Sequence, residues 1–233
     1  TPETLAAFRI ELGLNRPAYV RYFEWLSNAL QGDLGTALTN NREVLATITP
    51  RLINTLFLAG YAAVIAVPIA IFLGIFAAIN EGKWIDRAAN IVSLGAISVP
   101  EFFIAYILIF VFATNLGWFP SLSTVYSDMG FWQKIHVVAL PSITLTMLVT
   151  AHMLRMTRAS VLAIMSQPYI EMAFLKGLPR NQVILHHALP NAAAPIISVI
   201  ALNLAYLIVG VVVIEVVFVY PGVGQYMVDG VSK

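Results

Sequence analysis

A polar segment between two long apolar runs decides the fold. Residues 171–195 read EMAFLKGLPRNQVILHHALPNAAAP, which is too polar to cross a bilayer but carries the signals of two short helices. A Ser-Gln-Pro triplet that ends at Pro168 indicates where the first helix starts. Lys176, Gly177 and Pro179 indicate its end, because they supply a cation in the last turn, a left-handed cap and a helix breaker.

The rest of the segment predicts a second short helix. It is expected to begin near Asn181 and to end at Pro190. Glu171 lies near the first turn of the first helix, where the helix dipole favours an acidic side chain. The pattern alone leaves open whether this amphipathic hairpin lies on lipid headgroups or docks against another protein.

The composition indicates a membrane protein. The chain has 233 residues, of which 59% are hydrophobic and 11% are charged, whereas soluble domains carry about 25% charged residues. The net charge of +1 gives no indication of a nucleic-acid partner. The absence of cysteine excludes disulfides, thiolate catalysis and Cys-ligated metals.

Four apolar stretches are long enough to span a bilayer as helices, which needs about 20 residues each. They cover about 52–79, 89–113, 136–160 and 192–214. Strands of a membrane barrel would be shorter and alternating. We therefore expect an all-α, polytopic membrane helical bundle in a transmembrane domain over 51–233.

Loop charges predict the topology. Residues 80–88 and 155–191 carry most of the loop Lys and Arg, which places them in the cytoplasm by the positive-inside rule. Residues 1–50, 114–135 and 215–233 then lie on the outer, periplasmic side. An outer N-terminal segment needs something to carry it across, so we expect one span before the first residue. We expect another span after the last residue, because nothing there looks like a finished terminus.

The first fifty residues are expected to form a separate outer segment with two amphipathic helices, over 1–14 and 16–30, followed by a turn at GDLGTAL. The first span carries a face of small residues at every fourth position, which favours close approach of another helix. That face consists of Ala62, Ala66, Ala70, Gly74 and Ala78.

Two acids mark a possible translocation path or gate. Glu101 follows Pro100 inside the second span, and an ionisable residue at membrane depth is a functional candidate because its burial is costly. Its alternative role is to cap a broken helix. Glu215 ends the fourth span, and it either contacts substrate or bonds to the following loop, which contains Pro221 and Gly222.

Other motifs are missing from the sequence. The four histidines show no H-x-x-x-H spacing, so we expect no metal site. No Gly-x-Ser-x-Gly, no paired carboxylates and no Walker G-x-x-x-x-G-K-[ST] loop occur, so we expect no enzyme activity in this chain. Arg155 and Arg158 are expected to anchor the third span at the headgroups.

The polar segment resembles the EAA loop of ABC-importer permeases. Glu171, Ala173 and Gly177 match its first half, and His-Ala-Leu-Pro ending at Pro190 matches its close, while Met172 replaces the family's first alanine. GDLGTAL, INTLFLA, SVPEFF and E-x-x-F-x-x-P-G-x-G resemble the dipeptide, oligopeptide and nickel branch. The resemblance implies an ATPase-coupling loop over 166–190, formed by Glu171, Met172, Ala173, Lys176, Gly177, Leu178, Pro179, Leu189 and Pro190.

The resemblance also implies a function. It predicts a type I importer permease fold, with four spans visible of an expected six, in the bacterial inner membrane. The expected partners are a second homologous permease, two cytoplasmic ABC ATPases that hold ATP and Mg, a periplasmic binding protein and the bilayer. The expected cargo is a short peptide. Nickel or glutathione import on the same scaffold stays open, as does a stand-alone channel or secondary transporter.

Overall fold

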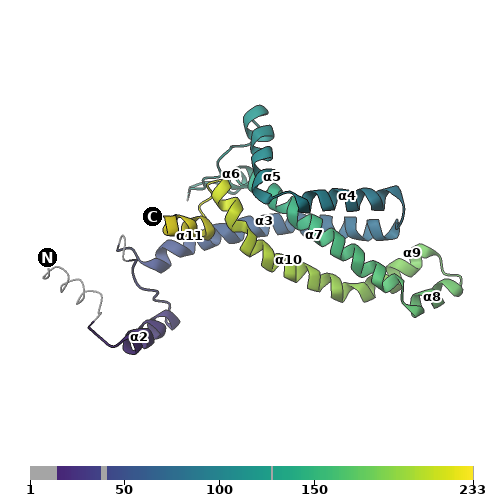
Figure 1. Ribbon diagram of the computed structural model, residues 1–233, viewed down its shortest axis with the longest axis horizontal. Helices are drawn as coiled ribbons and strands as arrows, with labels where there is room; N and C mark the ends of the chain where they lie inside the picture. The colour runs from purple at the N-terminus through teal and green to yellow at the C-terminus, as the bar shows by residue number, and fades with distance from the viewer. Residues whose placement is uncertain (1–14, 38–40, 127, 233) are drawn as a thin grey trace. The chain divides into compact units, whose positions relative to one another are not determined.

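The computed structural model divides the chain into two units, residues 1–52 and 53–233, which we describe separately (Figure 1). The helix expected over 1–14 lies outside the described residues. The residues that the structure describes are 15–37, 41–126 and 128–232.

The first unit contains α2 (Ala18–Leu30), which confirms the helix expected over 16–30. Pro17 precedes its first residue and fixes the backbone angle there. After the helix the chain turns at Gly32 and Gly35, whose φ angles of +88° and +78° suit a residue without a Cβ. No residue of α2 is buried, so its aromatic side chains remain available to a membrane interface.

All the regular secondary structure described in the second unit is helical. The helix α3 begins in the first unit and continues into the second. Apart from one isolated bridge between Thr36 and Glu43, the part of the chain that the structure describes contains no β structure. The helices are α3 (Val44–Ile79), α4 (Trp84–Ser98), α5 (Glu101–Leu108), the π-helix η1 (Ile109–Asn115), α6 (Phe131–Val137), α7 (Ala139–Met165), α8 (Pro168–Leu175), α9 (Arg180–Val183), the π-helix η2 (Ile184–Ala188), α10 (Leu189–Val217) and α11 (Val223–Ser232).

Two of the four expected spans are bent. By length and composition, α3 and the continuous helix 180–217 can each cross a membrane among the described residues, and two bent helix pairs raise that number to four if each counts as one span. The pair α4 and α5 bends by 99°. Pro100 causes this break, because proline disfavours helical geometry at Val99, which is extended (φ −94°, ψ 131°). The pair α6 and α7 bends by 60° at Val138.

The core forms where α3, α7 and α10 pack together, and Figure 1 shows α7 and α10 side by side over most of their length. Ala70 of α3 meets Met153 of α7 and Val199 of α10 in one buried cluster. A second cluster joins Ala78 to α7 and α10. All five residues of the small-residue face predicted for the first span are buried in α3, which confirms the close-packing face.

Gly74 marks the tightest contact between α3 and α7. A Cβ at this position would lie 2.8 Å from the Leu154 carbonyl oxygen and 2.8 Å from the Thr157 Cβ. We therefore expect Gly74→Ala to destabilise the protein by about 1–3 kcal/mol through overpacking. The measurement is the melting temperature of the purified protein in detergent. Gly60→Ala on the same helix is the control, because nothing lies within 4 Å of its added Cβ.

Candidate functional site

The polar segment folds as the predicted helical hairpin. The first helix, α8, has Pro168 at its first position and Glu171 in its first turn. Gly177 follows with φ +85°, the left-handed geometry expected of a helix-ending glycine. The amide of Leu178 donates to the Ala173 carbonyl at 3.3 Å and closes the turn. Lys176 and Pro179 lie on either side of this turn, exposed to solvent.

The hairpin has a small hydrophobic core of its own. Ile170, Ala173, Val183 and Ala188 are buried together, and Leu178 packs against them. Ala173 belongs to the expected ATPase-coupling loop, but its side chain is only 7% exposed and faces this internal core. The reason is geometric, because α9 and η2 fold back over that side of α8.

A different side of α8 is exposed and apolar. Met172 and Leu175 are three residues apart, so they lie on one face of the helix, and they are 56% and 75% exposed. Tyr169, one turn earlier, is also exposed. An exposed apolar face on a rigid hairpin is typical of a protein or membrane contact.

Pro190 does not end the second helix, which corrects the sequence prediction. The chain passes from α9 through the π-helix η2 directly into α10, where Leu189 and Pro190 are the first two residues. A proline clashes with the carbonyl of residue i−4 in regular helical geometry. The wider π turn immediately before Pro190 provides the space, so the helix continues without a break.

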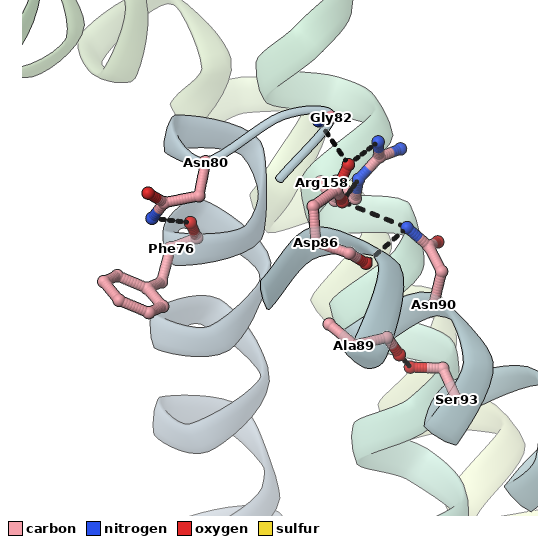
Figure 2. Close-up of polar contacts among 8 residues, drawn as sticks. All are labelled: Phe76, Asn80, Gly82, Asp86, Ala89, Asn90, Ser93 and Arg158. Carbon is pink, nitrogen blue, oxygen red and sulfur yellow. Dashed lines mark hydrogen bonds and ion pairs between the residues drawn. The ribbon is translucent and has the colours of Figure 1, made fainter. Parts of the chain in front are cut away.

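A buried ion pair joins α4 to α7. Asp86 is 4% exposed and accepts hydrogen bonds from the Arg158 guanidinium, with Nε–Oδ1 at 2.5 Å and Nη2–Oδ2 at 2.8 Å. Figure 2 shows the two side chains meeting between the helices. The backbone amide of Gly82 donates to Oδ2 at 3.0 Å, and the side-chain amide of Asn90 donates to Oδ1 at 3.0 Å. The carboxylate is thus satisfied by four donors from three parts of the chain.

This contact overturns one expectation. Arg158 was assigned to lipid headgroups together with Arg155, but its side chain pairs with Asp86 and is only 22% exposed. A bidentate Arg–carboxylate pair fixes the relative orientation of its two elements. Arg158 lies two turns before the end of α7, which leads directly into the hairpin. The pair therefore ties the loop between α3 and α4 to the base of the hairpin.

A second polar cluster lies at the C-terminal end of α10. Glu215 is fully buried, and its Oε1 accepts a hydrogen bond from the Thr55 hydroxyl at 2.6 Å. Its Oε2 accepts one from the backbone amide of Gln225 at 3.1 Å. Thr55 in turn accepts a hydrogen bond from the Val223 amide at 3.0 Å. Glu215 therefore bonds to the loop that follows α10, which is one of the two roles expected for it from the sequence.

The same loop is fastened to α3 by two further bonds. The Tyr220 hydroxyl donates to the backbone carbonyl of Asn54 at 2.7 Å. The side-chain amide of Asn54 donates to the backbone carbonyl of Pro221 at 3.0 Å. Burial, and secondarily the Glu215 carboxylate, raises the pKa of Tyr220, so its hydroxyl remains a donor. A Cβ on Gly222 would collide with the Glu215 carboxylate, so only glycine fits there.

Glu101 borders a cavity between α5, α7 and α10. The cavity has a volume of 530 Å³, and Glu101 lines it together with His152, Asn203 and Tyr206. Pro100 lies at the break just before this residue and sets the start of α5. Nowhere in 15–37, 41–126 and 128–232 do three or more His, Asp or Glu side chains gather closely enough to hold a metal ion.

Comparison with known proteins decides the family. Residues 70–232 match the model of a family described as "Binding-protein-dependent transport system inner membrane component". The chain belongs to this family. It is a transmembrane permease of a binding-protein-dependent ABC importer in the inner membrane, and it works with an ATPase and a substrate-binding protein.

Individual relatives cover nearly the whole permease. It is 38% identical over 230 residues to the glutathione transport system permease protein GsiC of Escherichia coli O6:H1. This alignment covers 99% of this chain and 72% of that protein. It is 36% identical over 235 residues to the probable peptide ABC transporter permease protein y4tP of Sinorhizobium fredii, which covers 100% of this chain and 74% of that protein.

Several residues of these clusters were not predicted from the sequence. Asp86 and Thr55 are single polar residues near span ends, where they resemble ordinary interfacial residues. One signal for Asp86 was available: it lies on the same predicted side of the membrane as Arg158 and carries the opposite charge. Asn203 and Tyr206 are three residues apart on α10, and this spacing could have indicated a shared polar face.

Proposed function

We propose that this permease forms the translocation path for short peptides, glutathione included, together with a second homologous permease and two ATPase subunits. The names of the two relatives carry the proposal, because one is a glutathione permease and the other a probable peptide permease, and each aligns over nearly all of this chain. Glutathione is itself a tripeptide, so one path of this kind serves both cargoes.

We further propose that the hairpin 166–190 is the coupling loop on which an ATPase pulls. Its internal core and the left-handed turn at Gly177 make it a rigid body. The exposed apolar residues Met172 and Leu175 provide a docking face. The Asp86–Arg158 pair would then carry the loop's displacement to α4 as well as to α7. ATP and Mg²⁺ are expected in the ATPase subunits.

Reconstitution tests the transport proposal. The permease is assembled in proteoliposomes with its second permease, ATPases and binding protein, and uptake of a labelled dipeptide, glutathione or Ni²⁺ is measured with and without ATP. We expect ATP-dependent uptake of the dipeptide or glutathione. Uptake of Ni²⁺ alone would replace the peptide assignment with nickel import, and uptake without the ATPases would indicate a stand-alone transporter.

The docking face makes a separate prediction. Leu175→Asp is expected to weaken retention of the ATPase by about tenfold or more, because it places a charge where an apolar contact forms. The measurement is co-purification of ATPase subunits with tagged permease at increasing salt and detergent. Leu122→Asp is the matched control, since Leu122 is exposed in the segment between η1 and α6, predicted to be periplasmic. Equal retention in both variants would remove Leu175 from the docking face.

A further inference from the structure

The cavity beside Glu101 has the size and lining of a ligand site. Its 530 Å³ falls in the range of about 300–1,000 Å³ that small-molecule pockets occupy. The lining is mostly apolar, from Leu145, Val149, Met156, Leu202 and other side chains. Four polar residues also line it, namely Glu101, His152, Asn203 and Tyr206. Such a ratio of apolar wall to a few polar groups is typical of binding sites.

Glu101 is the unusual member of this set. Its carboxylate has no hydrogen-bond or ion-pair partner among the residues that the structure describes, His152 of the same cavity included. No Lys or Arg is among the described residues that line the cavity. The positive end of α5 offsets part of the cost of an acid at its first position. Glu101 lies inside the second expected span, and a charge within a span normally pairs with another group. No such counter-charge is found beside it among the described residues.

The neighbouring polar groups complement a small amide. The Asn203 amide nitrogen donates to the Val199 carbonyl of its own helix at 2.8 Å. This arrangement leaves the amide oxygen as an acceptor. Tyr206, one turn further along α10, is an exposed residue whose hydroxyl can both donate and accept. A divalent metal ion does not suit the cavity, because it requires several oxygen ligands and the described lining residues supply only one carboxylate.

We propose that this cavity is a substrate subsite that binds the primary ammonium group of a peptide, with Glu101 as its counter-ion. The proposal rests on the proposed function, since both a short peptide and glutathione carry an α-ammonium group. Asn203 and Tyr206 then bond to the first peptide group, and the apolar wall contacts the side chain. The neutral walls hold the rest of the cargo weakly, which suits a site that must release it.

Equilibrium binding to the purified complex of both permeases and the ATPases, without binding protein, tests the subsite. The probes are labelled alanyl-phenylalanine and its N-acetylated form, which lacks the ammonium charge. We expect the free peptide to bind about tenfold or more tightly than the acetylated one. Glu101→Gln should abolish that difference, whereas Glu101→Asp should keep part of it. Glu24→Gln, an exposed change of the same kind on α2, should leave it unchanged.

Three results would overturn the subsite: equal affinity for the two peptides, a difference that survives in Glu101→Gln, and the absence of binding by the wild-type complex. Failure here is distinct from failure of the proposed function. Binding-protein-driven, ATP-dependent uptake by the wild type is measured in parallel. If peptide uptake is intact while Glu101→Gln binds both probes as the wild type does, only the subsite is refuted.

Discussion

Asp86→Arg is expected to abolish uptake and to reduce the amount of folded permease in the membrane. The variant replaces a carboxylate that is bonded to Arg158, Gly82 and Asn90 with a second cation. Breaking a buried pair by removing one partner costs about 3–5 kcal/mol, because the other charge stays buried without compensation. For a chain of this size, that loss lowers the melting temperature by roughly 10 °C.

The double variant Asp86→Arg with Arg158→Asp separates a specific pair from a general loss of folding. It restores opposite charges at the same two positions, so we expect part of the melting temperature and of the uptake to return. Recovery stays incomplete, because the Gly82 amide and the Asn90 side chain lose their shared acceptor. If the double variant is as impaired as the more impaired single variant, the pair is not the source of the effect.

A matched reversal on the surface provides the control. Arg16 and Glu24 form an ion pair at 3.0 Å with side chains that are 62% and 52% exposed. Exposed pairs contribute little to stability, since water and salt screen them. Glu24→Arg should therefore leave both melting temperature and uptake nearly unchanged, although it makes the same change in charge as Asp86→Arg.

The hairpin was predictable because its signals are local. Proline at the first helical position, an acid in the first turn and glycine at the left-handed cap each act within one helical turn. The helix start at Pro168 and the cap at Gly177 are both where the sequence placed them. The small-residue face of α3 was predictable for the same reason, because its spacing of four repeats along a single helix.

The polar clusters were not predictable because their partners are remote in sequence. Asp86 and Arg158 are 72 positions apart, and Thr55 and Glu215 are 160 apart. No periodicity relates such pairs, and each residue alone fits an ordinary interfacial role. Only the packing of α3, α7 and α10 determines which polar side chains meet.

Proline breaks the helix at one position, where a broken helix was one of two alternatives, and continues it at another, where the sequence predicted an end. At Pro100 the preceding residue becomes extended and the helix breaks by 99°. At Pro190 the chain instead widens into the π-helix η2 and continues as one helix. The sequence around a proline does not show which of these outcomes costs less. That choice depends on whether neighbouring elements hold the helix in line, as Ala188 is held in the core of the hairpin.

Gly222→Ala is expected to abolish uptake through the Glu215 cluster. The added Cβ would occupy the space of the Glu215 carboxylate, which must then move away from Thr55 and Gln225. A buried carboxylate that loses its donors costs several kcal/mol, about 1–3 for each unsatisfied group and more for a charged one. The loop between α10 and α11 would detach from α3, so the C-terminal end of α10 would no longer be held to α3 through this loop.

A second substitution makes this prediction specific. Glu215→Asp shortens the acid by one methylene and withdraws it from the added Cβ, so we expect Gly222→Ala combined with Glu215→Asp to recover part of the uptake lost by Gly222→Ala alone. Gly230→Ala on α11 is the control, because nothing lies within 4 Å of its Cβ. Uptake in proteoliposomes and protease resistance of the 217–223 loop are the measurements. Wild-type uptake in Gly222→Ala would show that the carboxylate can move at no cost, and the cluster would then have no role in fastening the outer loop.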